Sequence, residues 1–142
     1  DGHPSSKGNF QQDLEVLLRK EQLGATFATT QFFFQVENYF RLIESLQKSG
    51  SQLKVIPGIL PITNVKQLNR MVELSGTKIP PSIREKIDSI ENSDDVKKYG
   101  IEISTKMALD LLNFGAPGIH FYTMNSADST MAIAKNIGAF NE

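Results

Sequence analysis

The sequence predicts an α/β fold with parallel strands, built either as a portion of a closed α/β barrel or as a very small open sheet. Three short apolar segments have the pattern of strands, and helical patterns separate them. Strands separated in this way are joined as parallel neighbours by right-handed crossovers. A closed barrel of this type needs eight strands and about 250 residues. The chain has 142 residues, so it can supply only part of one.

The composition is that of one globular domain, with 39% hydrophobic and 22% charged residues. Fifteen basic and sixteen acidic residues give a net charge of -1, which argues against a nucleic-acid surface built from excess Lys and Arg. No apolar run approaches the roughly 20 residues needed to cross a bilayer. The absence of cysteine excludes disulfides and thiolate ligands, and two histidines cannot by themselves form a typical three-ligand catalytic zinc site. We therefore expect no metal, no nucleic-acid partner and no membrane partner.

The elements follow from apolar spacing, which recurs every three or four residues in helices and is continuous in buried strands. In chain order we expect a helix over 10–23, a strand over 25–30, a helix that includes 39–48, a strand over 53–56, a helix from Val65 to near Gly76, a helix beginning at Pro80–Pro81, a longer helix closed by Gly115, a strand over 118–122 and a helix over 127–136.

Particular residues set three of these boundaries. Pro57–Gly58 is expected to stop the second strand. Pro80–Pro81 suits the start of a helix, and Ser82 with Glu85 has the spacing of a capping box. Residues 93–95, Ser-Asp-Asp, are expected to cap the long helix.

Ligands of parallel α/β folds bind beyond the C-terminal ends of the strands. This rule selects Gln31 after the first strand, Pro57–Gly58 after the second and Tyr122–Asn125 after the third. Each also has a structural interpretation: Gln31 as a loop cap, the Pro-Gly pair as a turn, and Tyr122 as a residue that fills the barrel. Fold geometry sets the place without setting a role, so both interpretations stay open.

Other polar residues likewise have both a structural and a ligand-binding interpretation. Arg19 and Lys20, late in the first helix, either complement the helix dipole or contact a phosphate. Gln67 follows Asn64 at cap spacing, so a helix cap and a ligand contact are equally good interpretations. His3 lies in a polar loop, where a solvated side chain and a ligand contact are the alternatives.

Several blocks of the sequence resemble methylenetetrahydrofolate reductases. These are QFFFQVENYFRLIESLQKSG, VIPGILPITNVKQL and GIHFYTMN, together with GHP at 2–4 and DLEVLLRK at 13–20, which resembles the flavin-contacting segment of that family. The likeness extends from Gly2 to Gly138, and the blocks agree in order and spacing.

The resemblance implies an eight-stranded TIM barrel that binds FAD and reduces 5,10-methylenetetrahydrofolate to 5-methyltetrahydrofolate with NADH or NADPH. Residues 1–142 would be the C-terminal part of this single flavin-binding domain, with about three parallel strands, flanking helices and no N-terminal half. The acid and base residues of the family lie in that other half, so we expect no catalytic residue in this segment.

Eight residues match ligand-contacting positions of the family. For the flavin these are His3, Ser6, Asp13, Arg19 and Lys20; for the folate they are Gln31, Gln67 and Tyr122, and Gln31 also matches a nicotinamide contact. Three residues depart from the family pattern. Val16 replaces an Asn that contacts the flavin, Met71 replaces a Phe that stacks on the substrate, and Ser126 replaces an Arg. The exchange of Ser for Arg removes a charge-assisted hydrogen bond, so it bears on folate specificity.

Because half of the barrel is not in this chain, we expect the chain alone not to be a complete enzyme. Its expected partners are the N-terminal half of the barrel or a second copy, besides folate and NAD(P)H, and its expected location is the cytoplasm. The alternative function is that of a truncated or divergent non-catalytic homologue, acting as a binding or interaction module.

Overall fold

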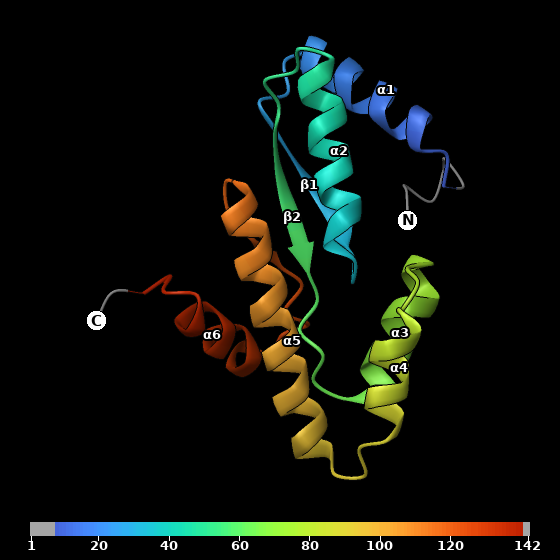
Figure 1. The fold of residues 1–142 in the computed structure, drawn as a ribbon, viewed down its shortest axis with the longest axis vertical. Helices are drawn as coiled ribbons and strands as arrows, with labels where there is room; N and C mark the ends of the chain where they lie inside the picture. Colours follow the sequence, from blue (N-terminus) through green and yellow to red (C-terminus); the bar gives the residue numbers. More distant parts are fainter. Residues whose placement is uncertain (1–7, 141–142) are drawn as a thin grey trace.

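In the computed structural model, which describes residues 8–140, three parallel strands alternate with helices in the arrangement of a portion of a (β/α)8 barrel (Figure 1). This confirms the predicted fold class. The elements in chain order are α1 (Phe10–Gln22), β1 (Phe27–Phe32), α2 (Val36–Lys48), β2 (Lys54–Ile59), α3 (Val65–Ser75), α4 (Pro81–Asp88), α5 (Ser93–Phe114), β3 (His120–Phe121) and α6 (Ala127–Asn136).

The strands are ordered β1-β2-β3, so β2 is central and the described part of the chain leaves one edge of β1 and one edge of β3 unpaired. Thr29 pairs with Ile56, and Phe32 pairs with Gly58. Three steps along β1 therefore match two steps along β2, which is a β-bulge at residues 30–31. Gly58 also pairs with His120 of β3, so the C-terminal ends of all three strands meet at one end of the sheet.

The predicted boundaries of the first two strands were wrong by a few residues. β1 runs two residues later than the expected 25–30, so Gln31 lies inside the strand instead of after it. β2 continues through Pro57–Gly58 to Ile59. The shift brings the apolar Phe32 into the sheet, where its side chain is 1% exposed, and this burial outweighs the local turn signal of a Pro-Gly pair.

Pro57 is tolerated in a central strand because of where its nitrogen points. Along a strand, successive N–H groups point to opposite neighbours. The Gly58 N–H donates to Thr30 Oγ1 on the β1 side, at 2.9 Å, so the Pro57 nitrogen faces the β3 side. β3 begins only opposite Gly58. Within the described sheet, Pro57 therefore removes no ladder hydrogen bond.

The predicted start of α4 was half right. Pro81 is the first helical residue, as expected, but the capping box of Ser82 and Glu85 does not form. The N-cap residue is Pro80, which makes no side-chain cap hydrogen bond, and both members of the expected box lie inside the helix.

The predicted cap of α5 was wrong by one residue. Ser93 is already helical, and the N-cap is Asn92, whose Oδ1 accepts a 2.8 Å hydrogen bond from the Asp94 N–H. The predicted ends of α3 and α5 are confirmed, because Gly76 and Gly115 adopt left-handed φ values of 69° and 104°, which glycine accepts without a Cβ penalty.

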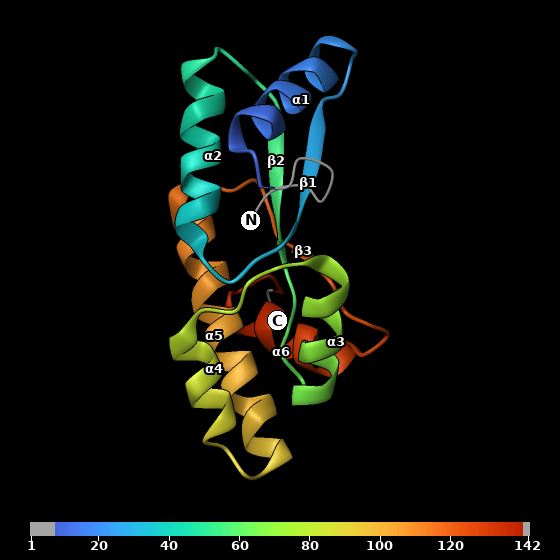
Figure 2. The ribbon, with the colours of Figure 1, turned by 90° about the vertical axis from the view of Figure 1, so that its right-hand side faces the viewer.

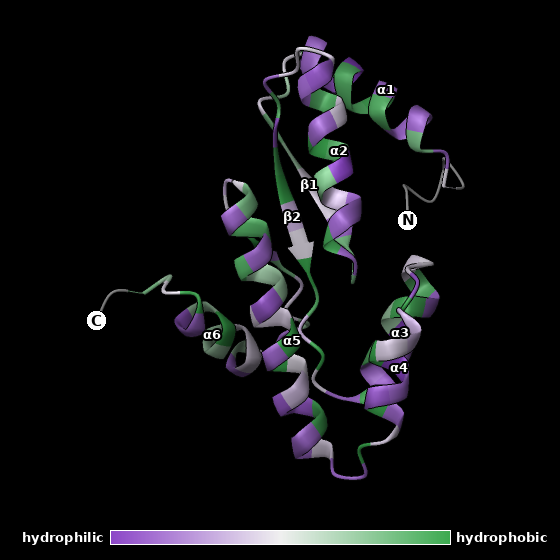
Figure 3. Ribbon diagram, viewed as in Figure 1, coloured by the Kyte–Doolittle hydropathy of each residue, from purple (hydrophilic) through white to green (hydrophobic). Residues whose placement is uncertain are grey.

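The main core lies between the sheet and the helices on one of its faces. Figure 2 shows α2 and α5 on the same side of the strands. Apolar side chains from these helices, from α1 and from α6 pack on the strands; the buried members of this cluster include Leu14, Leu46, Val55, Leu111 and Ile133. The amphipathic pattern of these helices, with polar and apolar bands, is visible in Figure 3.

A second core lies at the C-terminal ends of the strands. Phe32 and Phe34 from the end of β1 and Leu60 and Ile62 from the end of β2 pack with side chains from α3, α4 and the first turn of α5. Helices α3 and α4 are therefore tied to the end of the sheet where ligands of parallel α/β folds bind. Over residues 8–140, no helix combines the length and hydrophobicity needed to span a membrane.

Candidate functional site

The candidate site lies at the C-terminal end of the sheet, where the strands present Gln31, Gly58 and Tyr122 close together. Gln31 belongs to the bulge of β1, Gly58 is the next to last residue of β2, and Tyr122 follows β3 directly. The Tyr122 N–H donates to the Ile59 carbonyl at 2.9 Å, which extends the β2–β3 pairing by one residue and fixes the backbone of Tyr122 beside β2.

The Tyr122 side chain crosses the sheet end from β3 to β1. Its hydroxyl donates to the Thr30 carbonyl at 3.0 Å. Its ring makes edge contacts with Phe32, at 5.5 Å between centroids, and with His120, at 4.9 Å. Burial raises the pKa of the Tyr122 phenol above its usual value, so this side chain is a neutral hydrogen-bonding group at neutral pH.

Gln31 is exposed and has a free donor. Its Oε1 accepts a 3.1 Å hydrogen bond from the Phe32 N–H. Within residues 8–140 its amide nitrogen donates to no other group. The side-chain oxygen is thus held by the bulge while the NH₂ is available to a ligand, a combination that suits a carboxamide or the edge of a pterin.

Gln67 lies in the first turn of α3. The predicted helix cap at this position is confirmed, and it forms through the backbone N–H of Gln67. The Gln67 N–H donates to Asn64 Oδ1 at 2.8 Å. The Gln67 side chain is not part of this cap; its Oε1 accepts a hydrogen bond from the Thr63 hydroxyl. Because the cap uses only the backbone of Gln67, its side chain can contact a ligand without loss of the helix start.

The second core connects α3 to Tyr122. Leu68, next to Gln67, is 1% exposed in the cluster that also holds Phe32. Met71, one turn further along α3, and Tyr122 both pack against this cluster as partly buried members. The structure therefore brings α3 and the end of β3 together around the same apolar side chains.

The loop after β3 is a tight turn in a strained conformation. Met124 and Asn125 have positive φ values of 50° and 61°, and the Ser126 N–H donates to the Thr123 carbonyl at 2.9 Å. Two consecutive left-handed residues define a type I′ turn; for Met this conformation is rare and is found mainly at functional sites. The Met124 side chain is 48% exposed. The sequence analysis selected Tyr122–Asn125 as a possible ligand-binding segment after the third strand but did not predict the turn, for which Asn125 is a local signal.

Helix α1 presents Asp13, Val16 and Lys20 on one face. The spacing of three and then four residues places them in a line along the helix, about 10 Å long. Val16 is 46% exposed, whereas Leu14, Leu17 and Leu18 pack in the main core. This face thus carries the half-buried Asp13 carboxylate at one end and the exposed Lys20 ammonium group at the other.

Arg19 extends this polar surface at the end of α1. Both Arg19 and Lys20 are exposed in the last turn, where cations complement the helix dipole. The Arg19 Nη1 donates to Gln22 Oε1 at 3.3 Å, a weak exposed contact. His3 and Ser6, the other two predicted flavin contacts, lie outside the described residues.

The flavin-type positions on α1 and the folate-type position Gln67 on α3 lie in different parts of the described chain. Figures 1 and 2 both show α1 near one end of the long axis and α3 in the other half. Among the described residues, no group of three or more His, Asp or Glu side chains is placed to hold a metal ion.

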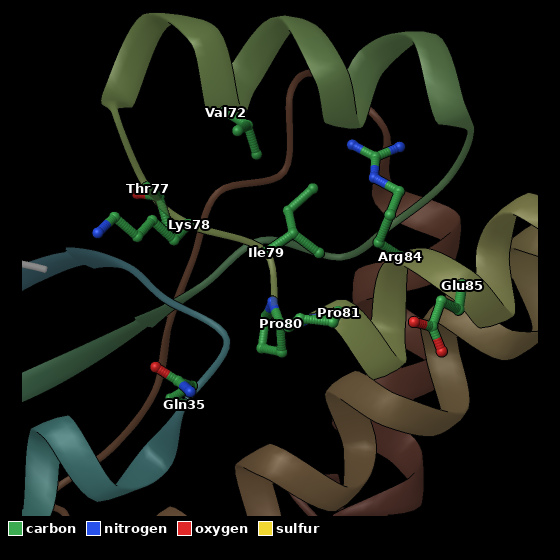
Figure 4. A pocket seen from close by; sticks show the side chains of 9 residues that line it. All are labelled: Gln35, Val72, Thr77, Lys78, Ile79, Pro80, Pro81, Arg84 and Glu85. Carbon is green, nitrogen blue, oxygen red and sulfur yellow. The ribbon is translucent and has the colours of Figure 1, made fainter.

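A separate pocket of about 770 Å³ opens between α3 and α4, with Gln35 at its edge (Figure 4). Its lining is mainly apolar, from Val72, Ile79 and Pro80–Pro81. Arg84 at its side is already held by Asn69 Oδ1 at 2.6 Å. Of the six predicted ligand contacts that the structure describes, none lines this pocket.

Comparison with known proteins decides the family. The family model described as "Methylenetetrahydrofolate reductase" matches residues 1–138. The chain belongs to the methylenetetrahydrofolate reductase family. The family resemblance of the sequence blocks is thereby confirmed.

Curated relatives of the chain come from a bacterium, an animal and a plant. It is 36% identical to the 5,10-methylenetetrahydrofolate reductase of Escherichia coli (strain K12), over 96% of this chain and 46% of the relative. It is 37% identical to a probable methylenetetrahydrofolate reductase (NADPH) of Caenorhabditis elegans, over 96% of this chain and 21% of the relative. It is 33% identical to methylenetetrahydrofolate reductase (NADH) 1 of Arabidopsis thaliana, over 94% of this chain and 23% of the relative. The chain thus spans less than half the length of these relatives.

A solved structure from Clostridium thermocellum has the same fold. It superposes with a TM-score of 0.68 at 17% identity, over 95% of this chain and 50% of that one. That protein is described as uncharacterized and as binding two copies of 5-methyl-5,6,7,8-tetrahydrofolic acid. At this level of identity the likeness shows the shared fold.

Proposed function

We propose that this chain is the C-terminal part of a flavin-dependent methylenetetrahydrofolate reductase, which reduces 5,10-methylenetetrahydrofolate to 5-methyltetrahydrofolate with NADH or NADPH. The observation that carries the proposal is the gathering of Gln31 and Tyr122 at the C-terminal end of the sheet, with α3 packed on the same apolar cluster as Tyr122. Family membership over residues 1–138 supports the type of reaction.

The exposed face of α1 fits an FAD molecule in its chemistry. The Asp13 carboxylate can accept hydrogen bonds from ribose or ribityl hydroxyls, and Arg19 and Lys20 can neutralise the diphosphate. His3 and Ser6 complete the proposed flavin contacts. When bound, FAD supplies the hydride-transfer chemistry, and the protein binds and orients it.

The end of the sheet would bind the folate. The Gln31 amide offers a free N–H donor beside a held oxygen, a pairing that matches the pterin edge and also the carboxamide of nicotinamide. Tyr122 forms a wall of the site as a neutral phenol, and the Gln67 side chain extends from α3. The folate-binding solved structure from Clostridium thermocellum, with the same fold, is in line with a folate ligand.

The rest of the proposed TIM barrel would be supplied by a further segment that pairs with the unpaired edges of β1 and β3. A strand edge carries a row of N–H and C=O groups that must be satisfied by another strand or by water. We propose residues 1–142 as the C-terminal part of one flavin-binding domain, with the acid and base residues on the other part. We also propose that the protein is located in the cytoplasm.

The flavin assignment is tested by the affinity of the full protein for FAD. Arg19→Ala and Lys20→Ala should each raise the Kd for FAD about tenfold, since hydrogen bonds to charged groups contribute roughly 1.5–3 kcal/mol. Lys48→Ala is the matched control, because Lys48 is an exposed cation in the last turn of α2. Unchanged FAD affinity in both α1 variants would contradict the diphosphate assignment.

Combining this chain with the N-terminal part of the barrel distinguishes an enzyme from a non-catalytic binding module. Ser126, which replaces an Arg of the family pattern, is the residue that favours the module. We expect NAD(P)H oxidation coupled to 5,10-methylenetetrahydrofolate when this chain is combined with the N-terminal part of the barrel. A complex that assembles but stays colourless and inactive would favour the module.

A further inference from the structure

Thr30 connects all three strands at the proposed folate site, through its side chain and its carbonyl. Its Oγ1 accepts from the Gly58 N–H on β2 at 2.9 Å. The same hydroxyl donates to the Gln31 carbonyl on β1 at 2.8 Å, and the Thr30 carbonyl accepts from the Tyr122 hydroxyl, beside β3, at 3.0 Å.

The bulge in β1 makes this arrangement possible. In a regular parallel ladder the Gly58 N–H would donate to a carbonyl of β1. At the bulge the extra residue of β1 interrupts the ladder, and the Thr30 hydroxyl takes the place of the backbone acceptor. This is the kind of local side-chain bond by which Thr competes with regular secondary structure. The Thr30 carbonyl is then free to accept from Tyr122.

Gly58 completes the arrangement by leaving room for the Tyr122 ring. A Cβ on Gly58 would lie 2.8 Å from Tyr122 Cε2 and 2.8 Å from the Thr30 carbonyl oxygen. The ring of Tyr122 thus lies over the glycine, and its orientation depends on how closely β1 and β2 approach each other at Thr30.

We infer that Thr30 is a positioning residue, whose hydroxyl holds the bulge in the conformation that orients Gln31 and Tyr122 toward the folate. This inference rests on the proposed function, because it assigns the folate to those two side chains. Thr30 itself lies partly buried in the sheet and is not proposed to touch the ligand. The residue therefore acts through the Gln31 backbone carbonyl and the Tyr122 hydroxyl, to which its hydrogen bonds connect it.

Two variants of Thr30 separate the hydroxyl from the shape of the side chain. Thr30→Val keeps the branched shape and removes the hydroxyl; Thr30→Ser keeps the hydroxyl. In the flavin-loaded full protein, T30V should raise the KM for 5,10-methylenetetrahydrofolate about three- to tenfold, the value of one hydrogen bond. The kcat and the FAD affinity should stay near the parental values, and T30S should restore the KM. An unchanged KM in T30V, or equal effects of T30V and T30S, would overturn the inference.

A second measurement does not require turnover. Tyrosine ¹³Cζ NMR of the same full protein, with the Tyr122 signal assigned by its loss in Tyr122→Phe, reports the hydrogen bond of that phenol. T30V should shift the Tyr122 signal and T30S should not; a signal that stays in place in T30V would overturn the positioning role. If the signal moves but the parental protein neither binds nor reduces folate, the positioning role stands and the proposed function fails.

Discussion

Gly100 of α5 lies directly against the backbone of Ile62, in the segment between β2 and α3. A Cβ placed on Gly100 would lie 1.9 Å from the Ile62 carbonyl oxygen. The neighbour is backbone, so no rotamer change can relieve the overlap. This approach allows α5 to close over the C-terminal end of the sheet, where the second core lies.

Gly100→Ala should therefore destabilise the protein, although Ala is the better helix former by about 1 kcal/mol. The overlap should outweigh this propensity and lower the free energy of unfolding by about 2–4 kcal/mol. Urea unfolding of the full protein measures the change. Gly118→Ala is the matched control, because a Cβ there meets nothing within 4 Å. A G100A variant as stable as the parent would show that α5 does not pack on Ile62 in this way.

The stability of the protein should fall between pH 10 and pH 12 because of Tyr39. Its hydroxyl donates to the Val55 carbonyl at 2.8 Å, and burial raises its pKa from 10.0 to about 12. Above pH 10 the unfolded chain releases the phenol proton while the folded chain retains it, so the contribution present below pH 10 is lost as the pH rises to about 12. Urea unfolding across this range measures the loss.

Tyr39→Phe is the control for this titration. It should cost about 1–3 kcal/mol at neutral pH, because the buried Val55 carbonyl loses its side-chain donor. Its free energy of unfolding should then fall less steeply than that of the parent above pH 10. Parallel curves for the two proteins would contradict the assignment to Tyr39.

The cap and the ligand interpretations of Gln67 can be separated by two substitutions. Asn64→Ala removes the side chain that caps α3 and should lower the free energy of unfolding by about 1 kcal/mol. Gln67→Ala leaves the capping backbone N–H in place, so stability should change by less than about 0.5 kcal/mol, while the KM for folate should rise. Thermal unfolding and steady-state kinetics of both variants are the measurements. If Q67A lost stability and kept the parental KM, Gln67 would be structural only.

Gly58→Ala should weaken folate binding without weakening FAD binding. A methyl group at this position would meet Tyr122 and the Thr30 carbonyl at 2.8 Å, and the ring of Tyr122 must move. We expect a folate KM raised about tenfold or more, together with a stability loss of about 1–3 kcal/mol. The FAD Kd should stay at the parental value, since the proposed flavin contacts lie on α1 and before it. A parental folate KM in this variant would remove Tyr122 from the site.

The type and order of the elements could be predicted from the sequence, because apolar spacing and chain-breaking residues are local signals. The ranges of α1 and α6 and the glycine ends of α3 and α5 follow from such signals alone. The resemblance of several ordered blocks was also sufficient to recognise the family, which residues 1–138 confirm.

Only the tertiary structure decided how β1 and β2 end and what orients Tyr122. Local signals favoured a stop at Pro57, but burial of Phe32 and the pairing of Phe32 with Gly58 extended both strands. The hydrogen bonds of Thr30 join it to Gly58 and Tyr122, 28 and 92 positions away in the sequence. Such contacts depend on strand register and on the bulge, which are set by packing across the whole sheet and have no local pattern in the chain.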